Sequence, residues 1–179
     1  MNISEKEIDS LITRYADDAH FSNIVLPRLR VLLAVQKEMN SNLIWTLNYS
    51  ATNRMENCLN ISLPDERQKF HFYYSIPLGL RLSIHLYLGD NTFNFFEAHP
   101  FLIKQGVIST DEYKVEATIN TLPHLVLTQR SDKYEQALLN KTDFSSQELK
   151  NSTLYKALQK AFEKFNPVLT QIIDGTLQM

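Results

Sequence analysis

Two neighbouring stretches of this 179-residue chain alternate between apolar and polar residues, and this alternation constrains the fold more than any other feature. In residues 70–76, and again in residues 80–88, strongly apolar side chains occupy every second position. Successive side chains of a β-strand point to opposite faces of a sheet, so each stretch predicts a strand with one buried face and one wetter face. Pro77-Leu78-Gly79 between them predicts a short hairpin turn.

The turn favours a register in which Ile76 pairs with Leu80, because this register keeps the two apolar faces together. A slip of one residue would invert one strand and bring its polar side chains into the core. The predicted pairs on the wetter face are His71 with His85, Tyr73 with Ser83, and Ser75 with Arg81.

The wetter face of this hairpin is the candidate binding surface. Aromatic and arginine side chains of this kind are enriched where proteins recognise partners. The alternative is an ordinary outer face, which is solvated or covered by the protein's own helices. The sequence leaves that choice open. The candidate binding residues are His71, Tyr73, Arg81, His85 and Tyr87.

Two further strands are predicted before the hairpin, at residues 43–49 and 57–63, because apolar residues again alternate there. Four consecutive strands with short links favour an antiparallel meander over residues 43–88. A fifth, short strand is predicted at residues 124–128. The side chains expected in the core are Trp45, Phe72, Tyr74, Leu82, Ile84, Leu86 and Phe162.

Helices are predicted at both ends of the chain. Ser4 and Glu7 form a capping box before apolar residues at helical spacing, and a second helix is expected over residues 27–39. The other predicted helices cover residues 93–104, 109–119, 131–140 and 146–165, the last after a capping box of Ser145 with Glu148.

The helix over residues 109–119 has a competing interpretation. Ser109 and Glu112 have the spacing of a capping box, which favours a helix. Tyr113, Val115, Ala117 and Ile119 alternate, however, so a strand stays possible. With the helix preferred, the prediction is a single α+β domain over residues 1–179, with a four- to five-stranded, mostly antiparallel sheet and N- and C-terminal helices packed on it.

Composition excludes few classes of function. The hydrophobic content of 44% is enough for a normal core, and the formal net charge of −2 gives no overall attraction to nucleic acid or to an anionic membrane. No apolar segment approaches the roughly 18 residues that a membrane span needs. The single cysteine, Cys58, cannot form an internal disulfide, and residues 1–7 do not resemble a secretory signal, so a cytoplasmic location is expected.

No catalytic residues, metal or cofactor are predicted. Four glycines cannot assemble a phosphate-binding or dinucleotide-binding loop. A nucleophilic Cys58 would need a base and an orienting group close by, and a small sulfur on a strand is far more often a packing residue. A metal needs three or four donors in tight geometry, and no zinc-type spacing is present. The histidines and the cysteine considered as donors are His71, His85, Cys58, His99 and His124.

A metal-dependent nuclease is the alternative enzyme class, because Asp65, Glu112 and Lys114 supply the residue types that such a site uses. Binding of nucleic acid without catalysis would use the aromatic face, although Lys69 and Arg81 are the main cations beside it. A lysine stripe on the last helix fits a solvated face more simply.

The sequence therefore predicts a non-catalytic protein-binding domain, such as an adaptor, a chaperone, an inhibitor or an immunity-like partner. Recognition would use a sheet face, and the partner would be another protein or a second copy of this chain. Nucleic acid is possible but not favoured, and no membrane is expected. Whether the protein is an enzyme is left uncertain, but a role without catalysis is expected rather than an enzymatic one.

Overall fold

A computed structural model describes residues 3–39, 41–50, 52, 57–65, 70, 72–78, 83–89, 95–119, 121–128 and 136–178. Its helices are α1 (Glu5–Arg14), the π-helical turn η1 (Phe21–Val25), α2 (Leu26–Met39), α3 (Phe95–Lys104), α4 (Gln136–Leu139), α5 (Ser146–Asn151) and α6 (Thr153–Ile173). Its strands are β1 (Ile44–Asn48), β2 (Cys58–Ser62), β3 (Phe72–Pro77), β4 (His85–Leu88), β5 (Lys114–Thr118) and β6 (Thr121–Val126).

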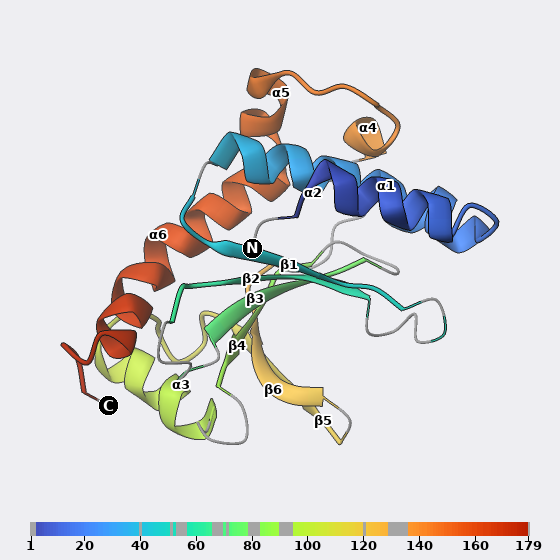
Figure 1. Cartoon of the computed structure of the whole chain (residues 1–179). Coiled ribbons are helices and arrows are strands. Elements are labelled where there is room, and N and C mark those ends of the chain that lie inside the picture. Colours follow the sequence, from blue (N-terminus) through green and yellow to red (C-terminus); the bar gives the residue numbers. More distant parts are fainter. Residues whose placement is uncertain are drawn as a thin grey trace.

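The strands form one antiparallel sheet in the order β1-β2-β3-β4-β6-β5, and helices lie at both ends of the chain (Figure 1). The α+β class and the meander from β1 to β4 are confirmed. The described sheet has six strands rather than four or five, because the segment predicted as the helix 109–119 contains β5.

The prediction of a helix at residues 109–119 was wrong because the capping groups close a turn instead. The backbone N–H of Ser109 donates to the Glu112 carboxylate at 3.2 Å, as in a capping box. The chain then enters β5, whose backbone pairs with β6. Tyr113 packs on Phe165 of α6, and the strand interpretation of this segment is confirmed over Lys114–Thr118, although Val115 stays 40% exposed.

The predicted hairpin register was also wrong. Tyr73 pairs with Tyr87, which lies four positions beyond the predicted partner Ser83. The reason is the connection: β3 ends at Pro77 and β4 begins at His85, so the link is longer than a tight turn. A shift by an even number keeps every side chain on its face, and the predicted faces are therefore retained.

The helical ends follow their capping signals. The Ser4–Glu7 and Ser145–Glu148 capping boxes both form, with each hydroxyl accepting from the backbone and each carboxylate accepting in return. The last predicted helix is divided, because Ser152 is extended, donates to the Leu149 carbonyl at 2.6 Å and accepts from the Tyr155 N–H at 3.1 Å. These bonds end α5 and cap α6.

The core lies between the sheet and the helices, and α6 crosses the apolar face of the sheet (Figure 1). Tyr74 is fully buried beneath α6, where its ring meets Phe162 at 5.0 Å and its hydroxyl donates to Asn166 Oδ1 at 2.6 Å. The expected core is confirmed for Trp45, Phe72, Tyr74, Ile84 and Leu86, while Phe162 is half-buried and Leu82 lies outside the described residues.

Ile84→Ala should lower the free energy of unfolding by about 2–5 kcal/mol, because the side chain is 1% exposed and its removal leaves a cavity. The matched control is Val115→Ala on the edge strand, where the side chain is 40% exposed and the loss should stay below about 1 kcal/mol. Urea unfolding measures both. Equal losses would contradict the placement of the core.

Tyr74→Phe should make the protein less sensitive to alkali. Burial raises the pKa of Tyr74, so the folded chain keeps the phenol protonated while the unfolded chain ionises it above about pH 10. Stability from this group is therefore present below pH 10 and falls by about 1.4 kcal/mol per pH unit above it.

Urea unfolding between pH 9 and 11 tests this effect. At neutral pH, Tyr74→Phe should lower the free energy of unfolding by about 1 kcal/mol, because the hydrogen bond to Asn166 is lost. Between pH 9 and 11, the free energy of unfolding of the variant should fall less steeply than that of the wild type. Parallel curves for the two proteins would show that Tyr74 ionises as readily in the folded chain as in the unfolded chain.

Candidate functional site

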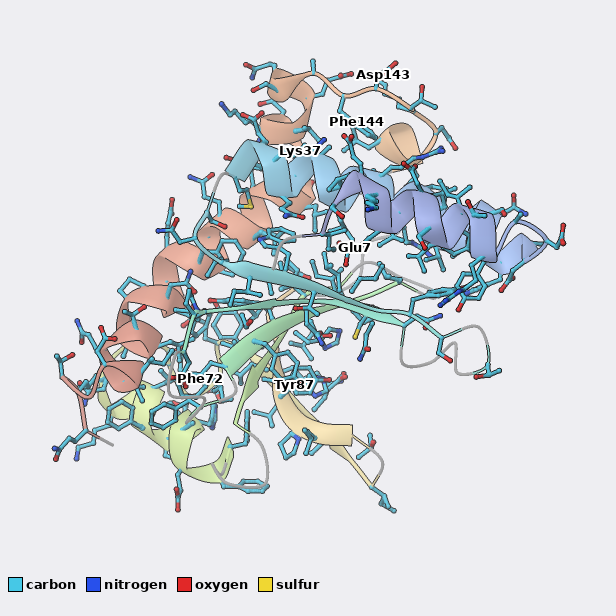
Figure 2. All side chains as sticks on the ribbon, in the orientation of Figure 1. Glu7, Lys37, Phe72, Tyr87, Asp143 and Phe144 are labelled. Carbon is cyan, nitrogen blue, oxygen red and sulfur yellow. The ribbon has the colours of Figure 1, made fainter. Side chains whose placement is uncertain are left out.

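The sheet face opposite Tyr74 carries the candidate site, and we call it the open face. It is defined by two rows of side chains that the cross-strand register aligns. In Figure 2, Phe72 of the apolar face lies toward α3 and α6, whereas Tyr87 of the open face lies on the side of β6. The first row is Ile44, Ser62, Tyr73, Tyr87, His124 and Glu116, and the second is Thr46, Asn60, Ser75, His85, Val126 and Lys114.

The structure brings three of the five predicted binding residues together on this face. Tyr73 and Tyr87 are paired across β3 and β4, and His85 lies two positions before Tyr87. All three are partly exposed. The other two predicted residues, His71 and Arg81, lie outside the described residues.

A stack of rings runs across three strands of the open face. The rings of Tyr73 and Tyr87 are 4.8 Å apart and nearly parallel, and the ring of His124 lies 4.6 Å beyond Tyr87. His85 meets His124 edge to face, with the ring centroids 4.9 Å apart. Such contacts hold the side chains in fixed positions before any partner arrives.

His124 is the residue that the sequence failed to place. It is only 5% exposed, and its Nδ1 lies 2.9 Å from the carbonyl oxygen of Leu122. A carbonyl can only accept, so Nδ1 carries the proton and the Nε2 lone pair points elsewhere. The sequence predicted a short strand at 124–128, but nothing in it showed that this strand pairs with β4.

Glu116 borders the same cluster from the edge strand. One carboxylate oxygen forms an ion pair with Lys114 at 2.6 Å, and the other lies 3.9 Å from His124 Nε2. Lys114 is the main cause that lowers the pKa of Glu116, with smaller contributions from the imidazoles of His124 and His85. The carboxylate therefore stays ionised at neutral pH.

Among the described residues, His85, Glu116 and His124 form the one group of three candidate metal ligands. One ligand atom from each lies within 4.8 Å of the other two. The ring of His85 is also held through Nε2, which lies 2.6 Å from the hydroxyl oxygen of the buried Ser83. The three side chains come from three adjacent strands, β4, β6 and β5, so the sheet itself positions them.

Cys58 lies near the open face. Its thiol lies 3.5 Å from Asn60 Oδ1, an amide oxygen that cannot act as a strong base. The pKa of Tyr87 is raised by burial first, then by the nearby charges that Cys58 and Glu116 would carry. The phenol of Tyr87 therefore stays protonated at neutral pH.

The residues considered for a nuclease do not converge. Asp65 accepts a hydrogen bond from the backbone N–H of Phe70 at 2.8 Å. Glu112 forms an ion pair with Lys164 of α6, which is the main cause that lowers its pKa. Lys114 pairs with Glu116 instead. Metal-dependent hydrolysis needs such groups gathered at one site, whereas these three contact different partners: Phe70, Lys164 and Glu116.

Comparison with known proteins does not assign a class to this site. No protein-family model, no curated protein and no solved structure matches the chain. A separate search of the described helices for a membrane span finds none with the necessary length and apolar character.

Tyr87→Ala should cost about 2–4 kcal/mol of stability, because the variant loses ring contacts with both Tyr73 and His124 as well as partial burial. Tyr87→Phe keeps both contacts and should cost less than about 1 kcal/mol. Urea unfolding of the two variants distinguishes a packed stack from a solvated row of rings. Similar small losses would show that the stack does not form.

Proposed function

We propose that this chain is a non-catalytic protein-binding domain that recognises another protein through the open face. The observation that carries the proposal is the stack of Tyr73, Tyr87 and His124, which is pre-formed on the side of the sheet away from α6. Tyrosines dominate the binding energy of many interfaces when a partner buries them. Because their rings are already ordered, little side-chain entropy is lost on binding.

Exposed apolar residues beside the stack support the proposal. Leu122 is 46% exposed and, by strand alternation, shares the face of His124. Ile119 is fully exposed at the end of the β5–β6 hairpin. Apolar residues on an exposed edge hairpin promote association, so they favour an interface that a partner covers.

The charge of the open face favours a protein over nucleic acid. In the two rows that define it, Lys114 is the one lysine or arginine, and its charge is compensated by Glu116. Nucleic-acid binding depends on several cations that replace counterions along the phosphates. A nearly neutral, aromatic surface instead suits a protein partner whose surface combines apolar groups with hydrogen-bonding groups. We propose that this binding takes place in the cytoplasm.

Leu122→Asp should abolish partner binding without unfolding the chain, because it introduces a charge at the edge of the open face. The matched control is Phe96→Asp, which changes a 67% exposed apolar residue on α3. The wild-type chain is used to capture a partner after nuclease treatment, and the partner is then purified and titrated. Leu122→Asp should weaken binding about 100-fold or more, and Phe96→Asp should leave it within about 3-fold.

Three outcomes would contradict the proposal. Equal binding by Leu122→Asp and wild type would place the interface elsewhere. Capture that disappears on nuclease treatment would identify nucleic acid as the ligand. Failure to capture any protein, together with a monomeric chain in sedimentation at high concentration, would exclude both a partner and self-association as the role of this face.

A further inference from the structure

Two histidines and a glutamate meet at one point of the open face, and protein recognition does not require this arrangement. The Nε2 atom of His124 and the Oε2 atom of Glu116 are 3.9 Å apart, which is too far for a direct hydrogen bond. His85 completes a group whose ligand atoms lie within 4.8 Å of one another. Three donors arranged around a shared space are what a bound cation needs.

We propose that His85, Glu116 and His124 bind one divalent transition-metal ion of the zinc class. Imidazole nitrogen with carboxylate oxygen suits Zn²⁺ and its first-row neighbours, whereas Mg²⁺ and Ca²⁺ prefer ligand sets of oxygen alone. Three protein ligands leave at least one coordination position for water or another ligand. This site goes beyond the proposed protein recognition and does not depend on it.

Groups around the three ligands hold them in the form that a metal needs. Nδ1–H of His124 donates to the Leu122 carbonyl, which leaves the lone pair on Nε2, the atom nearer Glu116. Such a hydrogen bond from the second ring nitrogen is usual for histidines that bind metals. The hydroxyl of Ser83 also holds the ring of His85, through a contact of 2.6 Å to Nε2.

The charge balance also fits a cation. Lys114 forms an ion pair with the Glu116 carboxylate but contacts only one of its oxygens, Oε1. The other oxygen, Oε2, faces His124. A divalent ion would therefore meet one carboxylate and two imidazoles in a partly buried position, where its charge is screened less than at the surface.

The ligands need only a small movement to close on an ion. Metal–ligand distances of about 2.0–2.2 Å place neighbouring ligand atoms roughly 3.0–3.5 Å apart, against the present limit of 4.8 Å. Glu116 can contribute to that movement, because its side chain has the most rotatable bonds of the three and belongs to the edge strand β5. The two histidines are positioned by their edge-to-face contact with each other and by the stack of His124 on Tyr87.

The test uses the full chain, Zn²⁺ in equilibrium dialysis and Co²⁺ as a spectroscopic probe. The wild type should bind one equivalent of Zn²⁺, and Co²⁺ should give visible absorption bands that Zn²⁺ abolishes. Glu116→Gln keeps the shape of the side chain but removes its charge, and it should weaken Zn²⁺ binding at least about 10-fold. Glu112→Gln is the matched control, because Glu112 is bound to Lys164 outside the cluster, and it should bind as the wild type does.

His85→Gln and His124→Gln supply the second measurement, with circular dichroism to show that each variant is folded. Each folded variant should lose the Co²⁺ bands. Absence of stoichiometric Zn²⁺ from the wild type would overturn the proposal, as would equal affinities of Glu116→Gln and Glu112→Gln. Binding that survives both histidine variants would place the ion elsewhere. None of these failures affects the Leu122 experiment, which concerns a protein partner.

Discussion

The packing of α6 across the apolar face of the sheet is the interaction on which the rest of the structure depends. Tyr74 shows how it works: the ring fills the space under the helix, and the hydroxyl reaches Asn166 without leaving a buried donor unsatisfied. A sheet of this kind is stable only when one face is covered, because the alternation of side chains gives each strand one apolar side. Once α6 lies on that side, the alternate residues must face the other way.

The open face therefore carries the strand residues that alternate with the core residues, and the order of the strands determines which of these residues lie next to one another. Because β6 inserts between β4 and β5, His124 lies between Tyr87 and Glu116. In a simple meander β5 would pair with β4, so a residue of β5 and not His124 would lie beside Tyr87. The same pairing places an imidazole next to a carboxylate and to a second imidazole, so one topological feature produces both the ring stack and the convergent ligands.

The sequence predicted what alternation and capping encode locally. Residues that are close together in the chain determine which face each of β1 to β4 buries, including the burial of Trp45 and Tyr74. They also determine two of the helix starts. The hairpin register was missed because the length of its loop is not visible in the strand pattern. The residues were still assigned to the correct faces, because a register shift of an even number of residues leaves each side chain on its own side of the sheet.

The candidate site was only half predictable. Tyr73, His85 and Tyr87 belong to two strands that alternate clearly, so they could be assigned to one face. His124 and Glu116 are distant in the sequence, and their arrival depends on the pairing of β6 with β4 and of β5 with β6. A local capping signal at Ser109 and Glu112 pointed to a helix, and a helix there would have removed Glu116 from the sheet. Long-range pairing of this kind has no local signal in the sequence.

Hydroxyl-radical footprinting of the free chain, read residue by residue in fragment spectra, tests most directly the claim that one sheet face is covered and the other open. Tyr73 and Tyr74 are adjacent in sequence but lie on opposite faces, so they serve as internal controls for each other. The structure predicts that Tyr73 and Tyr87 are oxidised while Tyr74 and Trp45 are protected. Protection of Tyr73 equal to that of Tyr74 would show that the open face is covered, and it would contradict the account.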